Sequence, residues 1–253
     1  VKQHSLSLLV EWVEPGQQLE TYLELTRAHH IDGMILMTPR TDDTGIKALE
    51  EADIPVVVMG YIPESTLHSV DVNNLEAAQE AVEHLISLGH RQIACITNAA
   101  LPFTSAVQRL DGYRRALESA GIPFDPDLVR EGDFEAKSGY RQMKSLLDSG
   151  KKFSAVFVAS DAVALGAYKA IWEAGLTIPG DISIVGFDDL PLSSFISPTL
   201  TTVHMPARKI AQDSCYLLMR LMKREFPESR MVSLPTTLII RDSTRELEES
   251  RMI

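Results

Sequence analysis

Short apolar runs alternate with segments of helical periodicity along most of this 253-residue chain. In its first part, the runs Leu6–Val10, Gly33–Met37 and Val56–Met59 predict strands, and the spacing within Leu19–His29 and Ile46–Ala52 predicts helices. Strands separated by single helices are typical of βαβ units, whose strands pair in parallel. We therefore expect an α/β fold built on parallel sheets with helices on both faces.

The same alternation restarts in the middle of the chain. Asn73 and Glu76 form a capping box before a helix that Gly89 ends. The strands and helices expected after it are Ile93–Thr97, Ser105–Ala120, Leu128–Arg130, Ala136–Leu147, Ala155–Val158, Ile182–Gly186, a helix after Pro206, and a last strand at Leu234–Arg241. This half repeats the architecture of the first half without repeating its sequence, which indicates two similar lobes.

Acidic residues directly follow two of these strands. Ser160-Asp161 comes after Ala155–Val158, and Asp188-Asp189 comes after Ile182–Gly186. Because open α/β sheets bind small ligands at the carboxyl ends of their strands, we expect a crevice here. Neighbouring carboxylates on one strand end cannot flank a bond as a glycosidase requires, and we find no activated nucleophile, metal set or phosphate-binding glycine loop. We expect no catalysis, no cofactor and no metal.

The charge and cysteine content narrow the class of protein. A net charge of -11 and a pI near 5.1 repel polyanions, so we expect no nucleic-acid contact by these residues themselves. No apolar run approaches the roughly 20 residues of a membrane-spanning helix, and Val1–Ser5 lacks the features of a signal peptide. Cys95 and Cys215 are expected to be buried thiols, which fits a cytoplasmic protein best.

Four longer segments occur in one characteristic order and spacing: SLGHRQIACI, RLDGYRRALESAGI, SDAVALGAYKAIWEAGLTIPGDISIVGFDD and SPTLTTVHMPARKIA. With them, the chain resembles the effector-binding core of the lactose/galactose repressor (LacI/GalR) family from about Leu6 to Ser243. The resemblance implies a periplasmic-binding-protein-like fold. Two doubly wound parallel-sheet lobes would be joined by three crossovers, with a small effector held between them.

The resemblance also implies where the lobes divide. Residues 1–98 and 206–230 would form the first, DNA-proximal lobe, residues 99–205 and 231–244 the second lobe, and residues 245–253 a tail. The three crossovers are expected near Asn98–Ala100, His204–Pro206 and Met231–Ser233.

The chain departs from the family pattern at its start. Family members begin with a helix-turn-helix head and a hinge that do not precede Leu6 here, so operator DNA would be contacted only through a head outside these residues. The strand and helix that open the family's first lobe are absent too. In the strand order 2-1-3-4-5 that strand is interior, and its loss would leave unpaired backbone on its two neighbours. We therefore expect a piece of a longer protein, unless a partner fills the slot.

Arg109 and Asp188 are the first candidates for effector contact. Arg109 in the RLDGY motif matches the family's effector-binding arginine, and its guanidinium could donate paired hydrogen bonds. Asp188 in the GFDD motif matches an acidic position, where a carboxylate could accept hydrogen bonds from two hydroxyl groups. The alternatives are an exposed helix arginine and a cap for the turn Leu190–Phe195. We expect Asp188 to contact the ligand and Asp189 to hold the backbone in place.

Three further candidates come from strand ends and loops. Ser160 occupies a position that is often asparagine in the family, and Asp161 follows it, although both could simply cap a helix. Phe134 matches a position where an aromatic ring stacks on the effector, unless it belongs to the core. Phe103 and Tyr61 are weaker candidates, each of which could also be core.

The function expected from these features is that of a transcriptional regulator's core. It would bind a small polar effector, a sugar or else a nucleobase, and would pair as a homodimer, with Tyr168 and Trp172 contributing to the contact. The alternatives are a solute-binding protein of a transporter, which shares the fold, and an enzyme, which the missing chemistry disfavours.

Overall fold

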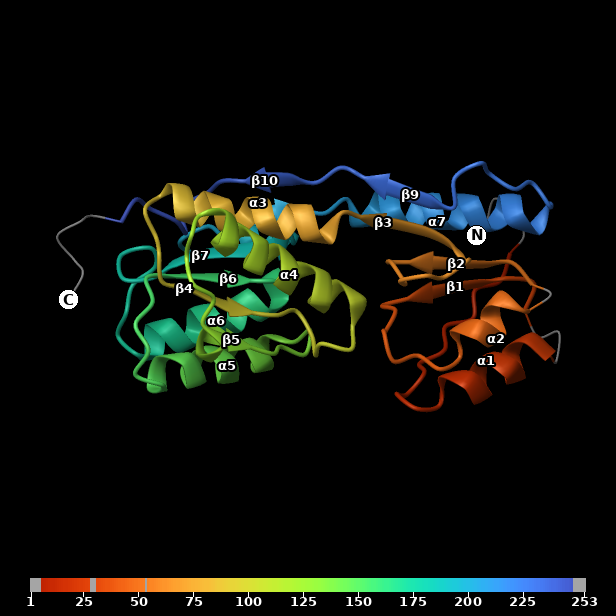
Figure 1. The fold of residues 1–253 in the computed structure, drawn as a ribbon, viewed down its shortest axis with the longest axis horizontal. Helices are drawn as coiled ribbons and strands as arrows, with labels where there is room; N and C mark the ends of the chain where they lie inside the picture. The colour runs from red at the N-terminus through yellow and green to blue at the C-terminus, as the bar shows by residue number, and fades with distance from the viewer. Residues whose placement is uncertain (1–5, 28–30, 53, 248–253) are drawn as a thin grey trace.

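In the computed structural model, which describes residues 6–27, 31–52 and 54–247, the chain forms two lobes side by side (Figure 1). The first lobe contains α1 (Gln18–Arg27), β1 (Met34–Met37), α2 (Ile46–Glu50), β2 (Val56–Met59), β3 (His68–Val72), α7 (Ala207–Met222) and β9 (Met231–Leu234). Its strands are parallel and pair in the order β1-β2-β3-β9. Val56 packs on Tyr22 and Leu49 of the first two helices, whereas its neighbour Val57 packs on Ile210 of α7. Helices therefore cover both faces of this sheet.

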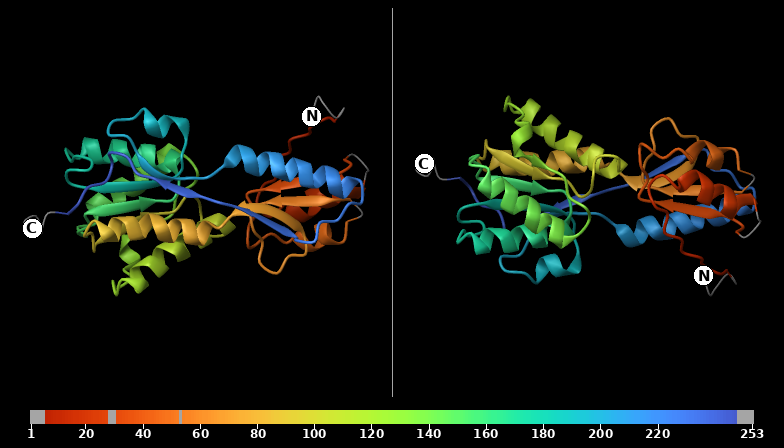
Figure 2. Two further views of the ribbon diagram at one scale, coloured as in Figure 1. Left: turned by 90° about the horizontal axis from the view of Figure 1, so that it is seen from above. Right: turned by 90° about the horizontal axis from the view of Figure 1, so that it is seen from below.

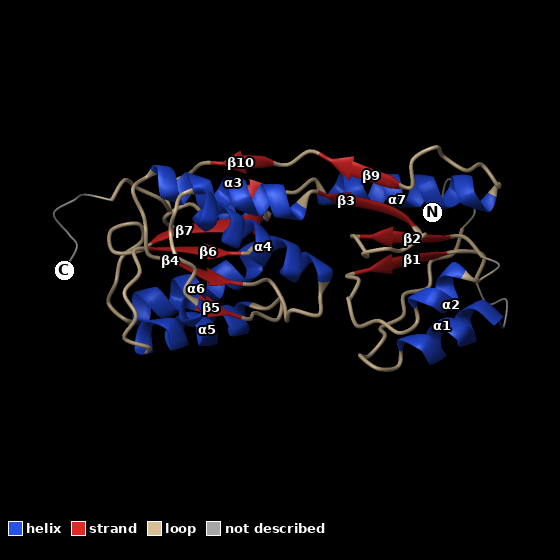
Figure 3. Ribbon diagram, in the orientation of Figure 1, coloured by secondary structure: helices blue, strands red, loops and turns tan. Residues whose placement is uncertain are grey.

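The second lobe is a larger layered sheet (Figure 3). Its elements are α3 (Asn74–Ser87), β4 (Ile93–Ile96), α4 (Thr104–Ser119), β5 (Val129–Arg130), α5 (Ala136–Asp148), β6 (Ala155–Val158), α6 (Asp161–Glu173), β7 (Ser183–Asp188), β8 (Thr201–His204) and β10 (Thr237–Ile239). The strand order is β10-β8-β7-β6-β4-β5, with β10 antiparallel to β8 and the others parallel. The direction of winding changes between β4 and β6, which creates a topological switch point. The predicted α/β fold class is confirmed.

Alternation along the buried strands sets the two faces of the second lobe. In β4, Ile93 and Cys95 pack under α3 and α4, whereas Ala94 and Ile96 pack under α5 and α6. The helix pairs are themselves in close contact, since a Cβ on Gly166 would overlap the carbonyl oxygen of Ala136. These close approaches fix the helices against one another and leave little room for movement within the lobe.

For α3, the predicted Asn73 cap and the Gly89 stop are confirmed, but the reciprocal bond of a full capping box, from Asn73 N–H to the Glu76 side chain, is not among the hydrogen bonds of the described residues. The Asn73 side chain accepts a hydrogen bond from the backbone N–H of Glu76 at 3.2 Å, as an N-cap should. Gly89 follows the helix with φ of 92°, a conformation that favours glycine.

The strand expected at Leu6–Val10 does not form, and that prediction is wrong. These residues are exposed and non-regular, and no strand of the described residues pairs with them. In the described part of the chain, β1 is the edge of its sheet and pairs with β2 alone. A run of apolar residues forms a strand only where a neighbour satisfies its backbone.

Three connections join the lobes, as Figure 2 shows, but two of them lie elsewhere than expected. The first lies between β3 and α3, because α3 packs on α4 and β4 pairs within the second sheet. Residues 74–98 therefore belong to the second lobe, and the expected boundary at 98 is wrong. An apolar helix stripe shows that a helix packs on a sheet but not which sheet.

The second connection, between β8 and α7, lies where it was expected. The third lies between β9 and β10, because the predicted strand Leu234–Arg241 is two strands in different sheets, with Pro235 between them. Proline cannot donate a backbone hydrogen bond and interrupts a strand ladder. Residues 231–234 thus lie in the first lobe, which corrects the boundary placed at 231.

Two smaller expectations also fail. The start of the expected tail is bound to the second lobe: the N–H of Arg245 donates to Ser183 Oγ at 3.2 Å and that of Leu247 to the Leu88 carbonyl at 2.8 Å. The remainder, residues 248–253, lies outside the described residues. Cys95 is buried as expected, but Cys215 is exposed on α7.

Candidate functional site

A cavity of about 220 Å³ lies between the lobes at the carboxyl ends of their strands. Asn98, which follows β4, and Ser160, which follows β6, both line it. The cavity therefore lies at the switch point of the second sheet, where doubly wound folds bind ligands. Of the predicted site residues, Arg109, Asp188, Phe134 and Ser160 line this cavity.

Arg109 is held by α4 at the centre of the site and is only 6% exposed. Its Nε donates to Asn74 Oδ1 at 2.9 Å, and its Nη1 donates to the Ala159 carbonyl at 2.7 Å and to Asp188 Oδ1 at 3.4 Å. The guanidinium stacks on the Phe187 ring at 3.6 Å. Among the described residues, Nη2 donates only to the Met205 sulfur at 3.9 Å, so most of its donor capacity is free for a ligand. The alternative of an exposed arginine is wrong, and the expected paired donors reduce to this one nitrogen.

Asp188 ends β7 and joins the arginine from the other side. Its Oδ2 accepts a hydrogen bond from Ser160 Oγ at 3.0 Å. Ser160 precedes α6 but makes no side-chain capping bond, so its hydroxyl serves the site and not the helix end. Burial raises the pKa of Asp188, and the charge of Arg109 opposes that rise. Burial likewise lowers the pKa of Arg109, and Asp188 opposes that fall.

Asp161 is placed away from the cavity, so the expectation of ligand contact is not supported. It is fully buried, and both carboxylate oxygens accept hydrogen bonds from protein groups: Leu190 N at 2.9 Å, Ser193 Oγ at 2.6 Å and Thr202 Oγ1 at 2.6 Å. Desolvation raises the pKa of Asp161 to about 6, although these bonds lower it. Asp161 therefore fixes the loop after β7 and strand β8.

Asp189 also bonds protein groups, in agreement with the structural role predicted for it. His204 Nδ1 lies 2.9 Å from one of its oxygens, and Arg241 Nη2 donates to the other at 2.7 Å. Hydrogen bonds from Arg241 and His204 lower the pKa of Asp189 despite partial desolvation. The two neighbouring acids thus face different partners, and Asp188 alone is left for the cavity.

Phe134 and Phe103 form an aromatic pair at the mouth of the cavity, with ring centroids 5.0 Å apart and nearly perpendicular planes. Phe134 lines the cavity and is 39% exposed, which argues against a plain core role. Phe103 does not line it. Phe103 instead forms a bridge with Arg40 of the first lobe, whose guanidinium lies 4.7 Å above the ring.

The backbone around Phe103 joins the lobes on this side. Thr41 N donates to the Pro102 carbonyl at 2.7 Å, and Thr104 N donates to the Pro39 carbonyl at 3.1 Å. We call the paired segments 39–42 and 102–104 the latch. The latch is thus a further link between the lobes beside the three chain connections.

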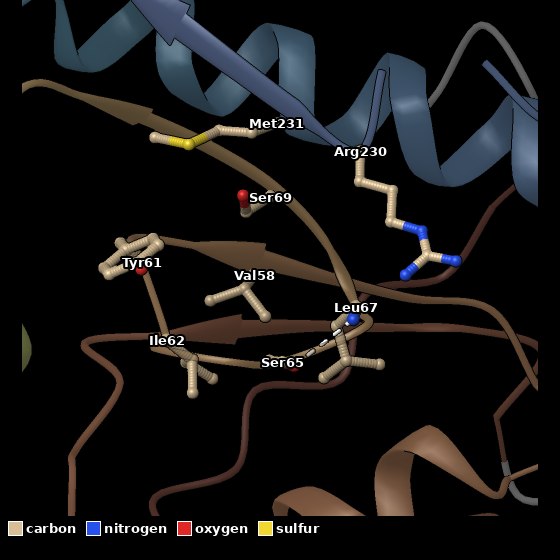
Figure 4. A pocket seen from close by; sticks show the side chains of 8 residues that line it. All are labelled: Val58, Tyr61, Ile62, Ser65, Leu67, Ser69, Arg230 and Met231. Atoms are coloured by element: carbon tan, nitrogen blue, oxygen red, sulfur yellow. Dashed lines mark hydrogen bonds between the residues drawn. The ribbon is translucent and has the colours of Figure 1, made fainter. Parts of the chain in front are cut away.

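Tyr61 lies outside the interlobe cavity, and the structure does not support its role as a contact there. It lines a separate pocket of about 90 Å³ within the first lobe, with Ser69, Arg230 and Met231 (Figure 4). The backbone turns at Gly60, whose φ is 132°, and this turn takes the Tyr61 side chain away from the interlobe face.

Strained backbone is concentrated around the interlobe cavity. Thr38, Phe134 and Asp188 all line it and have positive φ values of 50°, 65° and 113°. Such conformations cost about 1–3 kcal/mol each and cluster at ligand-binding sites. The surrounding fold therefore holds three side chains in positions that relaxed backbone would not give them.

Several lining residues escaped sequence reasoning. Asp71 and Asn74 lie at the β3–α3 connection, and Met37 and Ile210 supply apolar cover from the first lobe. Asp71 lies in the segment HSVDV, whose polar residues hid a buried strand. Placing the first connection correctly would have brought Asp71 and Asn74 to the cleft.

Comparisons with known proteins agree with this geometry. Residues 82–244 match the model of the periplasmic binding protein-like domain. The HTH-type transcriptional repressor CytR of Escherichia coli K12 is 37% identical over 246 residues, which cover 96% of this chain and 71% of CytR. The chain belongs to the LacI family of transcriptional regulators.

Solved structures of LacI-family regulators share the whole fold. The complex of the regulator CelR with cellobiose superposes with a TM-score of 0.83 at 34% identity, covering 90% of this chain and 70% of that one. The lac repressor dimer bound to operator and an anti-inducer gives a TM-score of 0.85 at 33% identity, covering 96% of this chain and 85% of that one. A LacI-family regulator from Enterococcus faecium with bound ribose gives a TM-score of 0.79 at 31% identity, covering 91% of this chain and 85% of that one.

The chain is thus the effector-binding core of a LacI-type regulator, and the transporter alternative is not favoured. The relatives are transcriptional repressors and not enzymes. Among the residues the structure describes, no group of three or more histidine, cysteine or acidic side chains could hold a metal ion. None of the described helices is long and apolar enough to cross a membrane.

Proposed function

We propose that the interlobe cavity binds a small polar effector, a sugar in the first place, and that its binding controls the DNA affinity of a head outside these residues. The observation that carries this is the convergence of Arg109 Nη2, the Asp188 carboxylate and the half-exposed Phe134 ring on one cavity. A carboxylate and a guanidinium bond hydroxyl groups, and a ring packs on sugar C–H groups. Cellobiose and ribose occupy the structures of two relatives.

A nucleobase is the second candidate. Phe134 offers a flat apolar face on which a base could stack, while Asp188 could accept a hydrogen bond from an N–H group. This alternative is tested in the same panel as the sugars.

Effector binding would act through lobe closure. An effector shifts an equilibrium between two lobe arrangements only by its differential affinity for them. Because the cavity draws residues from both lobes and the latch bridges them, an effector held between the lobes would favour the closed arrangement. Closure would rotate the first lobe about the three connections, and this rotation would be transmitted to the DNA-binding head.

We also infer a cytoplasmic homodimer, as is expected of a regulator acting on a palindromic operator. Tyr168 cannot contribute to the contact as expected, because it is 1% exposed and its hydroxyl donates to the Pro198 carbonyl at 3.2 Å. Trp172 stays half-exposed, and Leu192 and Phe195 are more exposed still. Sedimentation equilibrium at tens of micromolar should give a dimer, and a strict monomer would contradict this inference.

Thermal unfolding with a compound panel tests the effector role. Cellobiose, ribose, glucose and adenosine are offered in millimolar excess, and at least one should raise the midpoint by several degrees, since a ligand stabilises the state it binds. The double variant Arg109→Ala and Asp188→Ala should lose this shift. An unchanged shift in the double variant would remove both residues from the site.

A further inference from the structure

Asn98 lines the cavity and carries a buried acceptor without a partner among the described residues. It lines the cavity directly after β4 and is 2% exposed. Its Nδ2 donates to Ser105 Oγ at 3.1 Å, but its Oδ1 accepts no hydrogen bond from any described residue. A buried carbonyl oxygen without a donor is unfavourable, because burial has removed the water that would bond it. A rotation of the Asn98 side chain that turns this oxygen to the cavity would let an O–H or N–H group of a ligand satisfy it.

Asp71 adds a second carboxylate to the same cavity. Its oxygens accept hydrogen bonds from Val72 N at 2.8 Å and Asn74 Nδ2 at 3.0 Å, which fix the side chain at the β3–α3 connection. The charged residues that line the cavity in the described part of the chain are Asp71, Asp188 and Arg109. Two acids therefore face one cation.

The single cation is poorly placed to bind an anion. Phosphate and carboxylate are held best by two parallel N–H donors of one guanidinium. Arg109 spends Nε on Asn74 and Nη1 on Ala159 and Asp188, which leaves Nη2 alone for a ligand. A phosphate carries a charge of about -1.5 to -2 at neutral pH and would meet two carboxylates in a partly desolvated site.

We propose that Asn98 and Asp71 set the specificity of this cavity: Asn98 Oδ1 accepts a hydrogen bond from the effector, and Asp71 excludes effectors that carry a phosphate or carboxylate. The ligand class is then an uncharged compound rich in hydrogen-bond donors. This inference rests on the proposed function, because it assumes that the effector occupies the cavity.

Matched pairs of compounds test the exclusion. Titration calorimetry compares ribose with ribose 5-phosphate, glucose with glucose 6-phosphate, and adenosine with its 5′-monophosphate. At least one uncharged member should bind, and its phosphorylated partner should bind at least 100-fold more weakly. Equal or tighter binding of the phosphorylated member would overturn this inference alone. Absence of binding by every compound would contradict the proposed function, and this inference with it.

Single substitutions separate the two residues. Asp71→Asn should reduce the ratio of affinities between the uncharged compound and its phosphorylated partner by at least 10-fold. Asn98→Leu should instead weaken binding of the uncharged compound about 10-fold and leave that ratio unchanged. Asn98→Ala serves if the leucine variant unfolds. Asp127→Asn changes the net charge equally at an exposed side chain and should alter neither quantity. An unchanged ratio in Asp71→Asn, with wild-type stability, would contradict its role.

Discussion

The two walls of the interlobe cavity differ in chemistry. The second-lobe wall carries Arg109, Asp188, Ser160 and Asn98, each held by hydrogen bonds to other protein groups. The first-lobe wall presents mainly apolar surface, and among the lining residues Asp71 is its charged member. It includes Met37, Pro39, Met59, Ala207 and Ile210. Hydrogen-bonding groups are thus concentrated on the second lobe, whereas the first lobe supplies apolar cover and the negative charge of Asp71.

This division fits the packing of the lobes. The second lobe has close helix pairs and the buried Asp161 network, which hold its polar side chains in fixed positions. Directional hydrogen bonds require such preorganisation, whereas apolar cover does not depend on accurate angles. A lobe that moves can therefore supply apolar contacts without weakening the recognition of the effector.

Arg109→Met should break the contrast most strongly. The loss of the guanidinium leaves Asp188 and Asn74 without their buried partner, so we expect a fall of about 3–5 kcal/mol in unfolding free energy and at least 100-fold weaker effector binding. Urea unfolding and calorimetry measure the two effects. Arg114→Met, on the exposed face of the same helix, is the control and should keep wild-type affinity. Retained affinity in Arg109→Met would place recognition elsewhere.

Asp161→Asn should change the stability of the second lobe without changing its affinity for the effector. Burial raises the pKa of Asp161 to about 6, well above the ordinary value of about 3.9 for an aspartate, so the folded state binds a proton more readily than the unfolded state. The stability contributed by that proton is fully present below about pH 4 and is lost as the pH rises to about 6. The free-energy difference between wild type and Asp161→Asn should therefore vary by about 1.4 kcal/mol per pH unit in this window and be constant above it. If the unfolding free energies of wild type and Asp161→Asn differed by a constant amount across this pH window, the pKa shift would be contradicted. The effector affinity of Asp161→Asn at pH 7 should stay within about threefold of wild type, because Asp161 lies outside the cavity.

Met37→Ala should show the smaller contribution of the first-lobe wall. The side chain lines the cavity but is otherwise exposed, so its removal takes apolar area from the closed arrangement and little from the core. We expect up to about 10-fold weaker effector binding and an almost unchanged unfolding midpoint. Met222→Ala, at the far end of α7, is the matched control. A loss as large as that of Arg109→Met would remove the contrast between the walls.

Arg40→Ala should have the smallest effect. It removes the guanidinium from the Phe103 ring at the latch, a contact worth about 0.5–1 kcal/mol when exposed, and leaves the backbone bridge in place. Effector dissociation, measured by stopped-flow fluorescence, should accelerate about two- to fivefold. Arg141→Ala, an exposed arginine paired with Asp133, should leave the rate unchanged. No acceleration in Arg40→Ala would show that the latch does not retain the effector.

The sequence predicted the elements of the second lobe more fully than those of the first. Runs such as Ala155–Val158 are buried on both faces, and continuous apolar residues mark them as strands. The sequence does not predict the strand β3, which reads HSVDV, because the polar residues Ser69 and Asp71, each of which lines a cavity, interrupt its apolar pattern. Leu6–Val10 has the pattern of a strand but lacks a neighbour, which local sequence cannot reveal.

The candidate site was predictable where a residue type has one main use. Arg109 and Asp188 are predicted by the resemblance of the RLDGY and GFDD motifs to the family pattern, whereas their pairing with each other is visible only in the structure. The sequence does not predict the partners of Asp161, because a carboxylate at the start of a helix can serve a ligand or a neighbouring loop equally well. The sequence does not mark Asn98 as a site residue, because the lack of a hydrogen-bond partner for its side-chain oxygen is visible only in the folded structure.

A crystal structure with the most strongly stabilising compound of the panel tests the division of the walls most directly. The compound should lie between the lobes, with its polar groups bonded to Arg109 Nη2, Asp188 and Asn98 and its apolar surface against Met37 and Phe134. A compound bound outside this cavity, or one whose hydrogen bonds go mainly to the first lobe, would contradict the division.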